Sequence, residues 1–130
     1  MKNLNFNLTE KDAATAYAKA WNSLDCSDFI KLLADDAHYS SQYVLEEQTS
    51  KKAITEYLNG KLGAVRNSDT NVTADIGIVR KGYPGRDCTI LSQGDNDAVI
   101  LFEINDGKIK RFDLCMPELM DARKSGVCPK

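Results

Sequence analysis

Two stretches in the first half of the chain repeat apolar residues every three or four positions, the period of an amphipathic helix. The first starts after Thr9, which can cap a helix with Asp12 in a capping-box arrangement, and runs to about Ser23. The second starts after Ser50, which is also a plausible cap. Their apolar stripes are Ala14, Tyr17, Ala18, Trp21 and Leu24, and then Ile54, Tyr57, Leu58, Leu62 and Val65.

A short helix and a strand are predicted between these two helices. Asp25 or Ser27 can cap the short helix, and Asp35-Asp36 is expected to end it. Its buried face would be Phe29, Leu32 and Leu33. A strand is then predicted over residues 38–43.

The second half of the chain changes to the two-residue alternation of half-buried strands. Strands are predicted over residues 72–80, 88–92, 98–104 and 108–116, with turn signals between them. Successive hairpins predict a largely antiparallel sheet. The strand over 98–104 is apolar on both faces, so both of its faces must be covered. Residues 118–130 are expected to form a short frayed tail.

Length and composition bound the remaining possibilities. The 130 residues predict one domain over 1–130 with its core at about 9–117. The net charge of −2 does not favour binding to nucleic acid, which requires a basic surface. No apolar run is long enough for a signal peptide or a membrane span, so the expected compartment is the cytoplasm. The four cysteines show no CxxC pair and the single His lies far from them, so neither zinc nor another cofactor is predicted. The cysteines are read as small buried residues, with a disulfide involving Cys128 as the alternative.

The stretch from Trp21 to Ala37, with its Trp-Asn-x-x-Asp and Ala-Asp-Asp-Ala segments, resembles a signature of the nuclear transport factor 2-like superfamily. Residues 106–112 also resemble the penultimate hairpin of that superfamily, which includes ketosteroid isomerases and SnoaL-like polyketide cyclases. The resemblance covers about residues 9–117 and implies an α+β fold, in which a cone-shaped, curled antiparallel sheet wraps around N-terminal helices. It also implies a homodimer through the convex sheet face. It implies no particular reaction, because this fold hosts isomerases, cyclases, dehydratases, epoxide hydrolases and binding modules.

The resemblance places Tyr17 where the isomerases keep a tyrosine that donates a hydrogen bond to the oxyanion. The alternative is that Tyr17 simply packs in the helix stripe. The position of the isomerases' general-base carboxylate is occupied by Ser41, and Ile100 replaces the second oxyanion donor. Steroid-isomerase chemistry is therefore not supported, and the residues leave open whether the protein is an enzyme.

His38 and Asp113 are the other catalytic candidates. His38 could act as a base near neutral pH, but the resemblance to the isomerases implies that Tyr39 and Ser41 face the cavity and that His38 points away from it. Asp113 lies two residues short of the catalytic aspartate of SnoaL-like cyclases and is expected on the convex face, paired with Arg80 or Arg111. On its strand, the period of two separates Lys110, Phe112, Leu114 and Met116 from Ile109, Arg111, Asp113 and Cys115, and the resemblance to the isomerases implies that the first set faces the cavity.

The predicted cavity is therefore mostly apolar, with tyrosine and serine hydroxyls as its polar groups. Its expected lining is Tyr17, Trp21, Tyr39, Ser41, Tyr57, Leu58, Phe102, Phe112, Leu114 and Met116. Such a pocket favours a small, mostly apolar ligand, with Tyr17 and Tyr39 polarising a carbonyl group in an isomerase-, cyclase- or dehydratase-like protein. The alternative function is a non-catalytic dimeric interaction module whose cone is filled by side chains.

Overall fold

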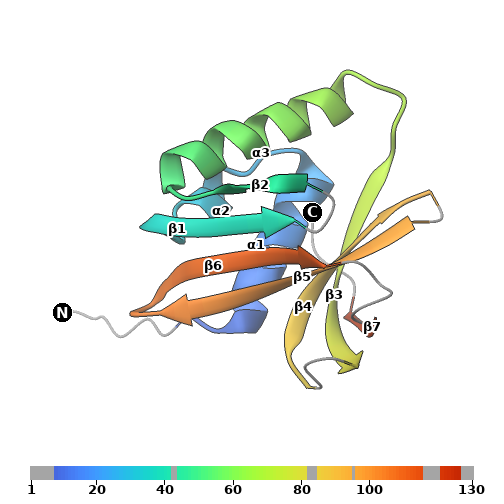
Figure 1. Cartoon of the computed structure of the whole chain (residues 1–130). Coiled ribbons are helices and arrows are strands. Elements are labelled where there is room, and N and C mark those ends of the chain that lie inside the picture. The colour runs from blue at the N-terminus through green and yellow to red at the C-terminus, as the bar shows by residue number, and fades with distance from the viewer. Residues whose placement is uncertain (1–7, 42–43, 82–84, 95, 116–120, 127–130) are drawn as a thin grey trace.

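A computed structural model of the chain describes residues 8–41, 44–81, 85–94, 96–115 and 121–126. Its helices are α1 (Glu10–Ser23), α2 (Ser27–Ile30) and α3 (Lys51–Arg66). Its strands are β1 (Leu33–Ser41), β2 (Val44–Gln48), β3 (Val72–Lys81), β4 (Asp87–Gln93), β5 (Asn96–Asn105), β6 (Lys108–Cys115) and β7 (Asp121–Gly126). They form one seven-stranded sheet in the order β2-β1-β6-β5-β4-β3-β7. Figure 1 shows β3 and β4 curling away from β1, whereas β5 stays beside β6, so that the sheet is curled and open.

Both long helices start at the predicted caps. The Thr9 hydroxyl accepts a hydrogen bond from the Asp12 N–H at 3.0 Å, and the Thr9 N–H donates to the Asp12 carboxylate at 3.1 Å. The Ser50 hydroxyl accepts from the Ala53 N–H at 3.0 Å. These bonds satisfy backbone donors that the first helical turn leaves unpaired, which confirms the two predicted helix starts.

The sheet is antiparallel at every junction except one, as the successive hairpins predicted. The exception is the junction of β1 with β6, which are parallel because the intervening chain crosses over instead of turning back. α1 packs on β3, β4 and β5, and α3 packs on β1, so the helices cover the concave face. None of the helices in the described part of the chain is long and apolar enough to cross a membrane.

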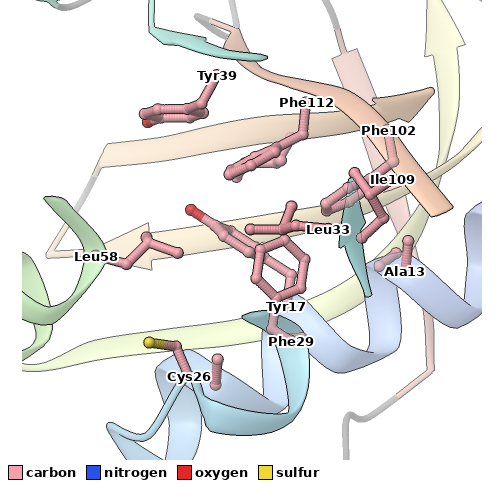
Figure 2. Close-up of a cluster of buried hydrophobic side chains, with 14 of the residues drawn as sticks. Ala13, Tyr17, Cys26, Phe29, Leu33, Tyr39, Leu58, Phe102, Ile109 and Phe112 are labelled. Carbon is pink, nitrogen blue, oxygen red and sulfur yellow. The ribbon is translucent and has the colours of Figure 1, made fainter. Parts of the chain in front are cut away.

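An aromatic cluster fills the deep part of the cone. Tyr17, Phe29, Phe102 and Phe112 are almost completely buried there. The ring of Tyr17 lies 5.0 Å from that of Phe29 and 5.5 Å from that of Phe112, centroid to centroid. Figure 2 shows these rings clustered between the helices and the sheet. Edge-to-face and offset contacts of this kind add to the free energy gained from burying the rings.

The convex face of the sheet carries a second apolar cluster, separate from the aromatic one. Its buried residues are Val79, Cys88, Ile90, Val99, Leu101 and Cys115. Because Ile100 and Phe102 lie in the concave core, β5 is covered on both faces, as its apolar sequence required. Cys26, Cys88 and Cys115 are free and buried, which confirms the reading of these three cysteines; Cys128 lies outside the described residues. Burial raises the pKa of the Cys88 thiol to about 12.

Asn22 and Thr89 attach α1 to the sheet through the backbone. The Asn22 amide donates to the Ala74 carbonyl and accepts from the Ala74 N–H, both at 3.0 Å. The hydroxyl of Thr89, a fully buried polar side chain, donates to the Ala14 carbonyl at 2.8 Å. Asn22, the Asn of the Trp-Asn signature, therefore has a structural role, because its amide forms hydrogen bonds with both backbone groups of Ala74 in β3.

The sequence pattern was wrong at three places between and after the main elements. Asp35-Asp36 does not end a helix; α2 is a single turn, and both aspartates lie exposed inside β1. The reason is the β6 backbone: the Ile109 N–H donates to the Leu32 carbonyl, which draws the chain into the sheet. The strand β2 was not predicted, and residues 121–126 form β7 along β3 instead of part of a frayed tail. In both cases pairing with an available strand edge outweighs a weak local preference.

Candidate functional site

A cavity of about 650 Å³ opens at the wide end of the cone, between α3 and the strands. α1 contributes Tyr17 and Trp21, and β1 contributes Tyr39 and Ser41. The lining is completed by Tyr57, Leu58, Lys61, Ala64, Val65, Ser68, Thr70, Val72, Leu91, Gln93, Asn96, Asp97, Ala98 and Leu114. Its size suits a small organic molecule.

Aromatic residues form the inner wall of the cavity, and each of them carries a polar group. Figure 2 shows the hydroxyl oxygens of Tyr17 and Tyr39 pointing to the same side, that of Leu58 and away from Ile109. The ring centroids of Tyr39 and Tyr57 are 5.5 Å apart. Burial raises the pKa of both Tyr17 and Tyr39 well above the ordinary value of a phenol. Both hydroxyls therefore stay protonated at neutral pH and can donate hydrogen bonds.

Trp21 carries an unused donor in this wall. Its Nε1 atom is buried and has no hydrogen-bond partner among the described residues. The indole packs against Tyr17 at 6.5 Å between ring centroids. A buried N–H without an acceptor costs about 1–3 kcal/mol, so native structures rarely leave one unexplained.

Seven of the ten predicted lining residues border this cavity. They are Tyr17, Trp21, Tyr39, Ser41, Tyr57, Leu58 and Leu114. Phe102 and Phe112 do not border it; their side chains fill the deep end of the cone. The reason is packing: both rings contact Tyr17 and close the space behind it. Met116 lies outside the described residues.

A β-bulge changes which residues of β6 face the core. Glu103 pairs with Arg111 and Ile104 with Ile109, so Lys110 is the extra residue. Ile109 joins the concave core with Phe112, and Lys110 instead forms an ion pair with Asp36. The predicted sides of Ile109 and Lys110 were therefore wrong, whereas the alternation holds beyond the bulge.

The other two catalytic candidates, His38 and Asp113, lie away from the cavity in a polar network on the outer face. His38 Nδ1 lies 2.6 Å from Glu47 Oε2, and Arg111 Nη1 lies 3.1 Å from the same oxygen. Arg111 also donates to Asp113 at 3.1 Å, and Ser40 donates to Asp113 at 2.7 Å. The hydrogen bond from His38, aided by the charge of Arg111, lowers the pKa of Glu47. The predicted outward positions and the Asp113–Arg111 pair are confirmed.

The positions that resemble the isomerases' carboxylates are apolar or neutral in the structure. Ser41 borders the cavity, and Ile100 is completely buried in the concave core. In the described part of the chain, no group of three or more His, Cys, Asp or Glu side chains is close enough to hold a metal ion. The chemistry available at the inner wall is therefore hydrogen-bond donation from neutral groups.

Sequence reasoning missed the outer half of the cavity. Lys61, Ala64 and Val65 continue the lining along α3, and the β4–β5 hairpin adds Gln93, Asn96, Asp97 and Ala98. A signal was present, because Lys61 stands three and four residues from Leu58 and Tyr57 and so shares their side of the helix. The hairpin residues gave no such signal, since the curl of the sheet brings them over the cavity.

No protein-family model matches this chain, and no curated protein matches it. Solved structures do. The chain is similar to a provisionally assigned ketosteroid isomerase from Kribbella flavida, at 18% identity and a TM-score of 0.57 over 93% of this chain and 83% of that one. It is also similar to a nuclear transport factor 2-like protein of unknown function from Cytophaga hutchinsonii, at 11% identity and a TM-score of 0.58 over 91% and 96%. A SnoaL-like protein of unknown function from Burkholderia thailandensis gives 14% identity and a TM-score of 0.59 over 87% and 91%.

These likenesses show the fold. The chain has the α+β, cystatin-like cone fold of nuclear transport factor 2-like proteins, as the Trp21–Ala37 stretch predicted. At such low identities they carry no activity or ligand over to this chain.

Proposed function

We propose that the protein binds a small, mostly apolar molecule in the cavity and holds a carbonyl oxygen of that molecule at the inner wall. The observation that carries the proposal is the buried Trp21 N–H, which has no acceptor among the described residues and belongs to a side chain that borders the cavity and packs against Tyr17. A ligand oxygen placed there would accept from the indole and from the Tyr17 hydroxyl.

The donors favour a neutral acceptor over a charged one. Trp21, Tyr17 and Tyr39 are all uncharged at neutral pH, because burial raises the pKa of both tyrosines. An anion buried against neutral donors alone would lose its hydration without gaining an opposite charge, which is costly. Burying a ketone or aldehyde oxygen costs far less hydration free energy than burying an anion, and two donors can pair with its two lone pairs.

The proposed function is limited to binding the ligand and polarising its carbonyl group. Isomerase-, cyclase- or dehydratase-like turnover would need a proton-abstracting group beside the carbonyl. His38 and Asp113 are engaged on the outer face, away from the cavity.

The test uses the only tryptophan of the chain, Trp21, as a reporter. Aryl and alkyl ketones titrated into the protein are expected to change its fluorescence. Tyr17→Phe, which removes one hydroxyl, is expected to lower the affinity for the tightest-binding ketone about three- to tenfold. That change corresponds to the loss of one hydrogen bond of about 0.5–1.5 kcal/mol. Ser40→Ala alters a hydroxyl of the same strand as Ser41, but on the outer face, and should leave the affinity unchanged. A Tyr17→Phe variant that binds as tightly as the wild type would contradict the proposal.

The second candidate function is the dimeric interaction module, which the filled deep end of the cone favours. The apolar cluster on the convex face is already buried within one chain, so a second copy would have to contact the half-exposed network of His38, Glu47, Arg111 and Asp113. Sedimentation velocity is expected to show a dimer that Arg111→Ala weakens. A wild-type monomer at every concentration would rule out the predicted homodimer.

A further inference from the structure

A single lysine stands on the cavity side of α3. Lys61 borders the cavity together with Tyr57 and Leu58, one turn before it, and Ala64 and Val65, one turn after it. Residues three and four apart lie on the same side of a helix, so Lys61 is in the middle of the lining stripe. A solvated surface lysine such as Lys52, on the same helix, does not border the cavity.

The ammonium of Lys61 lies over an aromatic wall of the cavity. Its Nζ is 5.5 Å from the centre of the Tyr57 ring, a cation–π distance. No carboxylate among the described residues forms an ion pair with it. The positive charge is thus held at the mouth of the cavity and is available to a ligand.

The one acidic residue of the lining does not oppose it. Asp97 belongs to β5, where side chains alternate between the two faces. Ala98 borders the cavity and Ile100 lies in the concave core, whereas Val99 and Leu101 lie in the convex cluster. Asp97 shares the parity of Val99, so the alternation assigns its side chain to the convex side and leaves its backbone as the part that borders the cavity. The charge that the cavity presents is therefore positive.

We infer that the molecule bound in the cavity carries an anionic group, a carboxylate, that pairs with Lys61 at the mouth. The inference rests on the proposed function and narrows it to apolar carbonyl acids. The two ends of such a molecule match the two ends of the site: neutral donors inside, where a charge would be costly, and a half-solvated cation outside. Tyr57, between them, offers its ring to the apolar body.

Three matched ketones test the charge. They are (4-acetylphenyl)acetate, its methyl ester and 2-(4-acetylphenyl)ethylamine, which share the aryl ketone and differ in the charge at the far end. Isothermal titration calorimetry is expected to show the carboxylate binding about three- to tenfold more tightly than the ester, with the ammonium weakest. The advantage should shrink as salt is added, because the pair is partly solvated.

Two variants locate the effect. Lys61→Met keeps the length and loses the charge, and is expected to abolish the preference for the carboxylate while the affinity for the ester stays the same. Lys52→Met should retain the preference. If the ester binds as tightly as the carboxylate to the wild type, or if the ammonium binds best, the inference is wrong and the proposed function stands. If no ketone of this set or of the earlier panel binds, both are wrong.

Discussion

Replacing Phe112 with alanine is expected to destabilise the fold by about 3–5 kcal/mol, the usual cost of emptying a buried aromatic site. Phe112 is completely buried, and its ring contacts those of Tyr39 at 4.5 Å and Phe29 at 5.3 Å, centroid to centroid. The rings of Tyr17 and Phe102 contact it as well. Because these neighbours are held by one another, they cannot collapse into the space. Since domains of this kind are stable by about 5–15 kcal/mol, urea denaturation should show a large fraction of the stability lost.

The matched control is Leu114→Ala, two residues along the same strand and on the same face. Leu114 is only half-buried and borders the open cavity, so its truncation enlarges a space that is already open to water. Its expected cost is about 1–2 kcal/mol, at or below the low end of the range for leucine truncations. Equal losses for the two variants would mean that the deep cone is not closely packed.

The helices could be predicted because each one repeats a local signal. Thr9 and Ser50 are caps whose hydroxyls reach the third residue of their own helix, and the stripes behind them have the helical period. The four predicted strands of the second half are similarly local, since each follows a turn signal. In these stretches the tertiary structure agrees with the local preference, so sequence alone was enough.

The errors lie where a distant partner decides. Leu32 leaves the helical pattern because its carbonyl accepts a hydrogen bond from the Ile109 N–H. No residue close to Leu32 in the sequence indicates this contact. The bulge at Lys110 reverses the parity of β6, and one extra residue moves Ile109 into the core. β7 forms because β3 offers a free edge to it, although its own sequence is poor in strand-forming residues.

The inner half of the candidate site was expected from the helix stripe and from the resemblance to the isomerases, and Tyr17, Trp21, Tyr39 and Ser41 do border the cavity. That the Trp21 N–H has no acceptor among the described residues could not be foreseen, because an indole in an apolar stripe looks the same in the sequence whether or not its N–H finds an acceptor. Lys61 was overlooked because a lysine in a helix is usually solvated. Only its position among the lining residues separates it from Lys52.

Asn22→Leu is expected to destabilise the protein by about 2–3 kcal/mol, although the new side chain has a similar size and is more apolar. Within the residues that the structure describes, β7 pairs with β3 only between Ile76 and Lys81, so the Ala74 N–H and C=O lie beyond β7 and are paired by the Asn22 amide. Losing the amide leaves a partly buried donor and acceptor without partners, each costing about 1–3 kcal/mol before water compensates. The melting temperature should fall by roughly 6–15 °C, at about 3–5 °C for each kcal/mol in a domain of this size.

Two further variants serve as controls for Asn22→Leu. Asn22→Asp keeps the acceptor and loses the donor, so its loss of stability should be intermediate. Ser23→Ala, which removes an exposed hydroxyl bonded only to the Lys19 carbonyl, should shift the melting temperature by less than about 2 °C. An Asn22→Leu variant as stable as Ser23→Ala would show that the amide positions α1 without stabilising it, and that the Trp-Asn signature needs another explanation.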